Sequence, residues 1–128
     1  MHVYVPLRAA YDYNQARSFA EVIAVMANQM LPKTTTVERA LSNRRGRIYI
    51  DYLQNSRGQT LACPYSVRPV RSASVSTPLQ WKELKHGLKP SDFTIFNMKR
   101  RLDKVGDLFA SVLKERTDIK KAIKLLEG

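Results

Sequence analysis

The segment Arg47-Ile48-Tyr49-Ile50-Asp51-Tyr52-Leu53 decides the fold class, because it is the clearest β-strand pattern in the sequence. Successive side chains of a strand point to opposite faces, which places Arg47, Tyr49 and Asp51 together. The other face, formed by Ile48, Ile50 and Tyr52, is apolar enough to belong to a core. Turn residues follow at positions 55–58, and the chain can return over 59–63 as a partner strand. The sequence therefore predicts a β-hairpin over residues 47–63.

Helical patterns lie on both sides of this hairpin. Asp12 and Gln15 have capping-box spacing, so we expect a helix from Asp12 to about Met30, ended by Pro32. Asn97 is the expected N-cap of a helix over 98–104 that Gly106 closes. We also expect helices at 36–42, 80–85, 107–114 and after Thr117, strands at 2–7 and 93–96, and a surface loop at 70–78.

This mixture of strands and helices predicts an α/β (α+β) fold, a mixed sheet with flanking helices. We expect a single domain over residues 1–128, with a helical C-terminal segment at about 98–127. The most economical interpretation of Cys63 and Trp81 is that both are core residues. His86 is expected in a surface loop.

The charge of the chain favours a polyanionic partner. It carries 22 Lys and Arg against 11 Asp and Glu, a net charge of +11. Nucleic acid is the first candidate, followed by nucleotide phosphates and an anionic membrane surface. The alternative is a basic surface without a specific partner.

Composition also bears on location. No apolar run approaches the ~18 residues of a membrane span, and the N-terminus lacks the pattern of a signal peptide. The only cysteine, Cys63, excludes an internal disulfide. We therefore expect a soluble cytoplasmic protein without a membrane partner.

Common catalytic frameworks are absent from the sequence. The five glycines are scattered rather than gathered in a phosphate loop, and one Cys with two distant His does not make a zinc site. Asp51 stands out because a carboxylate near a strand end, close to Arg44 and Arg57, suits a site where a metal meets phosphates. The alternative is a surface ion pair between Asp51 and an arginine.

The sequence resembles the polymerase domain of bacterial DNA ligase D, of the archaeo-eukaryotic primase superfamily. The likeness covers about the first 110 residues. It is carried by 45–55 around Ile50-Asp51-Tyr52-Leu53, by Pro64-Tyr65-Ser66-Val67-Arg68, by 75–81, by 90–95 and by 2–7.

The resemblance implies a metal-dependent nucleotidyltransferase that adds nucleotides at broken DNA ends during non-homologous end joining. It implies that Asp51 is a catalytic metal ligand for Mn²⁺ or Mg²⁺ and that His2 and Arg68 bind the nucleoside triphosphate. Arg44 and Gln54 fall at positions that border the nucleotide. Without the resemblance, His2 and Arg68 would be interpreted as a strand-end histidine and a solvated turn arginine. DNA ends and nucleoside triphosphates are the implied partners, and the bacterial cytoplasm (nucleoid) is the implied location.

The chain departs from the family pattern in one respect. The family supplies two further metal-binding carboxylates in an Asp-x-Asp pair on an earlier strand, and no Asp-x-Asp occurs here. The sequence begins at the family histidine, so we expect the C-terminal half of a primase-polymerase fold, inactive on its own.

Two other interpretations stay open. One is a non-catalytic basic DNA-binding module. The other is a half-domain whose sheet edge pairs with a missing N-terminal half or with a second copy, and a ligase domain is a further candidate partner. The lysines of the last helix either touch DNA phosphates or form a solvated face.

Overall fold

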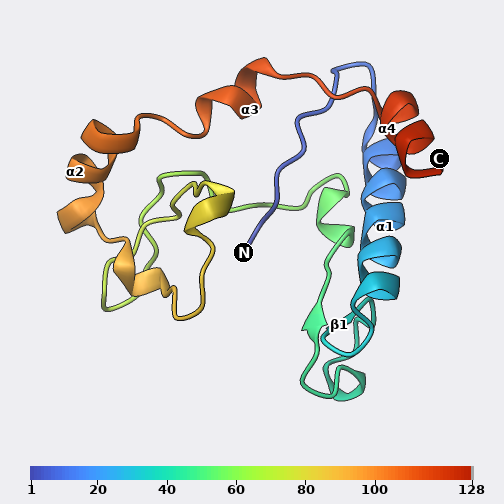
Figure 1. Cartoon of the computed structure of the whole chain (residues 1–128), viewed down its shortest axis with the longest axis horizontal. Helices are drawn as coiled ribbons and strands as arrows, with labels where there is room; N and C mark the ends of the chain where they lie inside the picture. The colour runs from blue at the N-terminus through green and yellow to red at the C-terminus, as the bar shows by residue number, and fades with distance from the viewer. Residues whose placement is uncertain (128) are drawn as a thin grey trace. The chain divides into compact units, whose positions relative to one another are not determined.

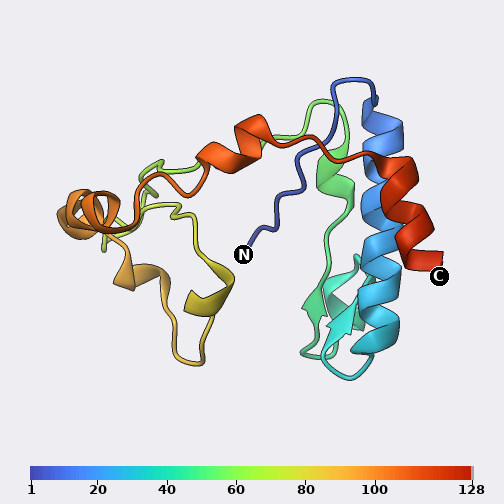
Figure 2. The same ribbon diagram turned by 45° about the horizontal axis from the view of Figure 1, so that its top comes forward.

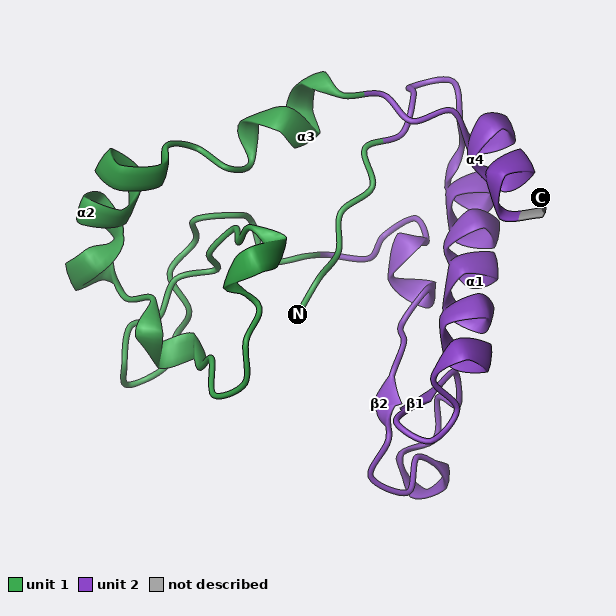
Figure 3. Cartoon of the chain, viewed as in Figure 1, with its two compact units in different colours: residues 1–6, 61–115 green, residues 7–60, 116–128 purple. Residues whose placement is uncertain are grey.

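A computed structural model describes residues 1–127 and divides them into two compact units (Figure 3). Unit 1 comprises residues 1–6 and 61–115, and unit 2 comprises residues 7–60 together with the chain from 116 onward. The expectation of one partial domain over 1–128 stays a prediction. None of the helices among the described residues is long and apolar enough to cross a membrane.

Unit 2 is built around helix α1, Tyr13–Met30 (Figure 1). The predicted capping box is present: the Asp12 carboxylate accepts from the Gln15 amide at 2.8 Å, and the Gln15 side chain accepts from the Asp12 amide at 3.0 Å. The helix buries Phe19 and Ala24. This helix is confirmed over its whole predicted length.

The sheet of unit 2 is parallel, and the predicted hairpin is wrong. Strand β1, Thr35–Thr36, pairs with strand β2, Ile48–Tyr49, in a two-stranded sheet. The expected helix at 36–42 is replaced by β1 and by the 3-10 helix η1, Leu41–Asn43, in keeping with the strand preference of a threonine run. The α/β class is therefore confirmed in its coarse form, as helices with a small parallel sheet.

The hairpin fails because Asp51 ends the strand. Its carboxylate accepts the Leu53 amide at 3.0 Å and so competes with ladder bonds. The chain then enters the 3-10 helix η2, Leu53–Asn55, and residues 59–63 form no strand. The turn at 55–58 is confirmed, with Gly58 at φ +83°. Ile48, expected in the core, is 68% exposed.

Helix α4, Ile119–Glu127, runs beside α1 in both views of the ribbon (Figures 1 and 2). Asp118 holds its first turn: the carboxylate accepts from Tyr11 Oη at 2.9 Å, forms an ion pair with Arg8 at 3.1 Å and accepts from the Lys120 amide at 3.0 Å. The capping oxygen therefore comes from Asp118 rather than from Thr117, whose backbone carbonyl accepts from the Arg8 amide. Instead of the strand predicted at 2–7, the structure has an isolated bridge from Leu7 to Thr117.

Unit 1 contains helices α2, Ile95–Val105, and α3, Ala110–Lys114, with 3-10 helices η3, Trp81–Glu83, and η4, Pro90–Asp92. Gly106 ends α2 at φ +70°, as predicted. The strand predicted at 93–96 is wrong because Thr94 is the N-cap of α2 and donates its amide to Asn97 Oδ1 at 2.9 Å. The loop predicted at 70–78 contains buried Ser74 and Val75, which bridge to neighbouring segments.

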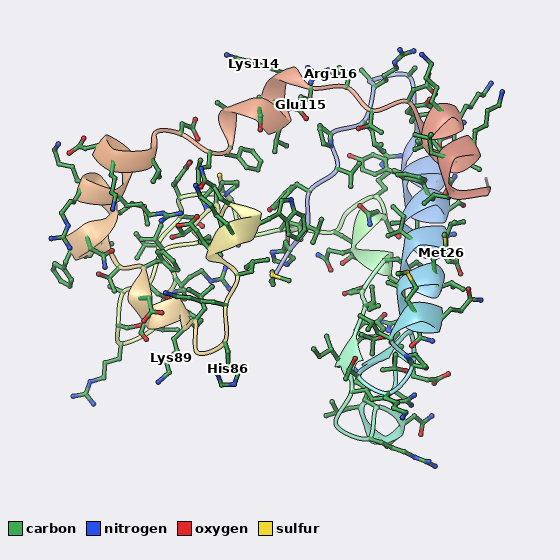
Figure 4. All side chains as sticks on the ribbon, viewed as in Figure 1. Met26, His86, Lys89, Lys114, Glu115 and Arg116 are labelled. Carbon is green, nitrogen blue, oxygen red and sulfur yellow. The ribbon has the colours of Figure 1, made fainter. Side chains whose placement is uncertain are left out.

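A fork of two hydrogen bonds joins α2 to η3. Arg101 donates to the two carboxylate oxygens of Glu83 at 2.6 and 2.8 Å and to the Pro78 carbonyl at 3.0 Å. Because this fork holds η3, Trp81 is not needed as an anchor and is 74% exposed. Cys63 is exposed as well, so both core predictions are wrong. His86 is exposed, as expected, and lies on the loop between η3 and η4 (Figure 4).

We expect Glu83→Gln to destabilise unit 1. The hydrogen bonds from Arg101 lower the pKa of Glu83 from its ordinary 4.5 to about 2. A depressed carboxyl pKa adds stability above the unfolded value, here roughly 3 kcal/mol, and this stability is lost as pH falls from about 4.5 towards 2. Urea unfolding between pH 2 and 7 measures it, and an unchanged pH dependence in Glu83→Gln would contradict the assignment.

We expect Tyr11→Phe to loosen α4. The hydroxyl donates to Asp118 and accepts from the Ile119 amide at 3.1 Å, so its removal leaves two groups without their partner. The cost should be about 1 kcal/mol. Hydrogen exchange should show faster exchange of the Ile119 amide, while α2, which lacks this contact, serves as the internal reference. Equal protection in both proteins would argue against the contact.

Candidate functional site

The five predicted site residues fall into both units. Arg44, Asp51 and Gln54 belong to unit 2, while His2 and Arg68 belong to unit 1.

In unit 2, Tyr49 links the two charged candidates. The Arg44 guanidinium stacks over the Tyr49 ring with its carbon 4.3 Å from the ring centroid, and it donates to the Arg39 carbonyl at 2.8 Å. Burial raises the Tyr49 pKa, and the negative charge of Asp51 raises it further. Arg44 and Asp51 thus both interact with the same phenol. Sequence reasoning grouped Tyr49 with Asp51 on one strand face but gave the tyrosine no role.

One hydrogen-bond donor of Arg44 is unused. Its Nε atom is buried and has no hydrogen-bond partner among the described residues. An unpaired buried donor carries a desolvation cost of about 1–3 kcal/mol. An acceptor that reached this nitrogen would therefore find an arginine already positioned by stacking.

Asp51 presents an exposed carboxylate at the end of β2. One oxygen accepts the Leu53 amide, and within residues 1–127 no ion pair joins Asp51 to an arginine. The alternative of an Asp–Arg surface pair therefore finds no support. Gln54 is engaged in its own loop, where Nε2 donates to the Thr60 carbonyl at 2.6 Å.

In unit 1, the His2 ring is exposed and meets the edge of Tyr4 at 6.4 Å between centroids. Tyr4 in turn makes an edge contact with Phe109 at 5.2 Å. Arg68 donates its backbone amide to the Ser74 carbonyl at 2.7 Å, and its side chain is exposed. The backbone of Arg68 is thus fixed while its guanidinium is accessible to an anion.

Tyr65 is a residue that sequence reasoning quoted without a role. It stands in the same Pro-Tyr-Ser-Val-Arg motif as Arg68 and has a positive φ of 65°. Its hydroxyl donates to Asp107 at 2.6 Å, and burial with this bond raises the Tyr65 pKa. The feature that distinguishes Tyr65 is its left-handed backbone conformation, which is unusual for a tyrosine and is visible only in the structure.

The described residues do not complete a metal centre. Within residues 1–127, no group of three or more His, Cys, Asp or Glu side chains could hold a metal ion. Two-metal nucleotidyl transfer needs several carboxylates around ions ~3.5–4 Å apart. Asp51 is the single candidate ligand that both the sequence and the structure place at a strand end, so the residues present do not fit the metal pair.

Comparison with known proteins gives one consistent result. The protein family described as "LigD, primase-polymerase domain" matches residues 1–109. The bifunctional non-homologous end joining protein LigD of Bacillus subtilis (strain 168) is 37% identical over 107 residues, which is 83% of this chain and 18% of that protein. The multifunctional LigD of Pseudomonas aeruginosa is 30% identical over 106 residues, 83% of this chain and 13% of that protein.

A solved structure agrees with these relatives. The polymerase domain from Mycobacterium tuberculosis ligase D, in complex with DNA, superposes with a TM-score of 0.74 and 26% sequence identity. The match covers 83% of this chain and 37% of that one. The chain therefore spans well under half of the polymerase domain and less than a fifth of the two LigD proteins.

We expect Asp51→Asn to lower the pKa of Tyr49. Asparagine keeps an oxygen for the Leu53 amide but removes the charge that opposes ionisation of the phenol. NMR-monitored titration of the Tyr49 ring measures the effect. Tyr65, whose raised pKa has other causes, is the internal control. A Tyr49 pKa that stays unchanged would show that the charge of Asp51 does not act on the Tyr49 phenol.

Proposed function

The chain belongs to the LigD primase-polymerase domain family, and from this premise we propose that it is a portion of a DNA repair polymerase acting in non-homologous end joining. In this role it binds nucleoside triphosphate and DNA ends. The observation that carries the proposal is the family match over residues 1–109, which includes all five candidate residues. Two facts support DNA as a partner: the similar polymerase domain was solved in complex with DNA, and this chain has a net charge of +11.

In this proposal Arg68 is the main triphosphate contact. A guanidinium can donate two parallel hydrogen bonds to phosphate oxygens, and the exposed side chain of Arg68 is open to such a ligand. His2, also exposed, adds a donor to the same triphosphate. Arg44 and Gln54 border the nucleotide in this proposal, where the Arg44 guanidinium is positioned by its stacking on Tyr49.

Asp51 supplies one carboxylate for Mn²⁺ or Mg²⁺ in this proposal. A catalytic metal pair polarises the phosphoryl oxygens and needs further carboxylates, which the family carries in its Asp-x-Asp pair. Since the described residues hold no such group, we propose that these 128 residues alone bind without catalysing nucleotidyl transfer.

Calorimetric titration of a nucleoside triphosphate into the purified chain, with and without Mn²⁺, tests this function. We expect binding that Arg68→Ala weakens by about tenfold or more, because a charge-assisted hydrogen bond contributes ~1.5–3 kcal/mol. Arg71→Ala is the matched control, since Arg71 is an exposed arginine of the same loop.

The control separates a site from general charge. An equal loss in both variants would show that the triphosphate follows the net charge rather than Arg68. Salt-dependent DNA binding without any response to Mn²⁺ or triphosphate would contradict the proposal and favour a non-catalytic DNA-binding module.

A further inference from the structure

We propose that the lysine face of α4, formed by Lys120, Lys121 and Lys124, is a second DNA-binding surface that grips the phosphate backbone. The matched family region ends at residue 109, so α4 lies outside it. The choice of DNA as the polyanion rests on the proposed function, while the surface itself rests on the geometry of α4.

Helix α4 is held against α1 by contacts at its first turn. Asp118 pins its first turn through Tyr11 and Arg8, and Ile119 is buried with 7% exposure. A groove between α1 and α4 is lined by side chains of both helices, including Phe19, Val22 and Ile123, with Lys120 at its exposed edge. These contacts fix which face of α4 is turned towards α1, beside which the helix lies in both ribbon views (Figures 1 and 2).

The lysine face of α4 concentrates positive charge. At 3.6 residues per turn the three lysines fall within a sector of about 100°, opposite the buried Ile119 side. All three are exposed, and none pairs with a carboxylate among the described side chains. Asp118, the nearest acid, is neutralised by Arg8. Like charges three and four residues apart cost helix stability, and a bound polyanion removes that cost.

The spacing of the three lysines suits contact with neighbouring phosphates of one DNA strand. Lys120 and Lys124 are separated by about 6 Å along the helix axis at 1.5 Å per residue. One DNA strand offers a phosphate every ~3.4 Å of duplex axis, so the three ammonium groups can reach two or three neighbouring phosphates. Such contacts give affinity without reading base sequence, which suits the binding of DNA ends of any sequence.

An anionic membrane is the less suitable partner. A helix that lies in a membrane surface must bury its apolar face in lipid. In α4, Ile119 is buried and Ile123 lines the groove with α1, which leaves Leu125 and Leu126, 83% and 43% exposed, as the large apolar side chains that could meet lipid. Duplex DNA needs only the charged face.

Salt-dependent binding of a blunt-ended DNA duplex to the full chain tests the proposal. We expect Lys120→Gln/Lys121→Gln/Lys124→Gln to flatten the slope of log K against log [salt] by about 2–3, at ~0.9 per phosphate contact, and to weaken binding tenfold or more near 0.1 M salt. Glutamine is a good helix former, so α4 should persist. Lys124→Gln alone should flatten the slope by about 1 and serves if the triple variant fails to fold.

The matched control removes three charges outside α4, as Lys85→Gln/Arg100→Gln/Lys104→Gln, where all three side chains are exposed and none is in an ion pair among the described residues. An equal change in slope would show that net charge, rather than the α4 face, governs binding and would overturn the proposal. If the triple α4 variant loses binding to phosphatidylserine vesicles but binds DNA as the unmodified chain does, the proposal is overturned in favour of a membrane. If the triple α4 variant keeps the same slope of log K against log [salt], only the α4 surface is overturned. If the unmodified chain binds no DNA, the proposed function is overturned too.

Discussion

The fork from Arg101 to Glu83 is the interaction on which unit 1 depends, because this unit has little apolar core. Val75 and Met98 are its buried large apolar side chains among the described residues. A charge-assisted fork between partly buried partners is stronger than a neutral hydrogen bond and fixes direction as well as distance. It ties α2 to η3 and so sets the frame around the loop that carries Arg68. Asp118 has the corresponding role in unit 2, where it fixes α4 against the start of the chain.

These two carboxylates explain how a chain with many exposed apolar side chains keeps defined elements. Burial of a large apolar side chain contributes ~1.5–3 kcal/mol, and few residues here are buried deeply enough to gain it. Hydrogen bonds with good geometry then decide which segments meet. The small core also bears on the difference between binding and catalysis that we propose. Arg68 and His2 are single exposed donors and need no large core to hold them, whereas a metal pair needs several carboxylates held together.

Sequence reasoning succeeded where the signal was local. The Asp12–Gln15 capping box and the Gly106 stop depend on a few neighbouring residues, and both are confirmed. It failed where a distant or competing contact decided the outcome. Alternation predicted a hairpin over 47–63, but Asp51 captured the Leu53 amide and the strand paired with β1 instead. Trp81 was assigned to the core but is 74% exposed, and η3 is held instead by the Glu83–Arg101 fork, whose partners lie 18 residues apart in the chain. The family was recognised from motifs around Asp51 and Arg68, whereas the stacking of Arg44 on Tyr49 needed coordinates.

Our central proposal is that this chain keeps nucleotide- and DNA-binding elements of a repair polymerase domain without the carboxylates that nucleotidyl transfer requires. The most direct measurement is nucleotide incorporation by the purified chain on a DNA duplex with a recessed 3′ end, supplied with nucleoside triphosphate and Mn²⁺ or Mg²⁺. We predict that the primer is not extended, while the same preparation binds the duplex. Primer extension that disappears in Asp51→Ala would contradict the account, because it would show that the residues present assemble an active centre by themselves.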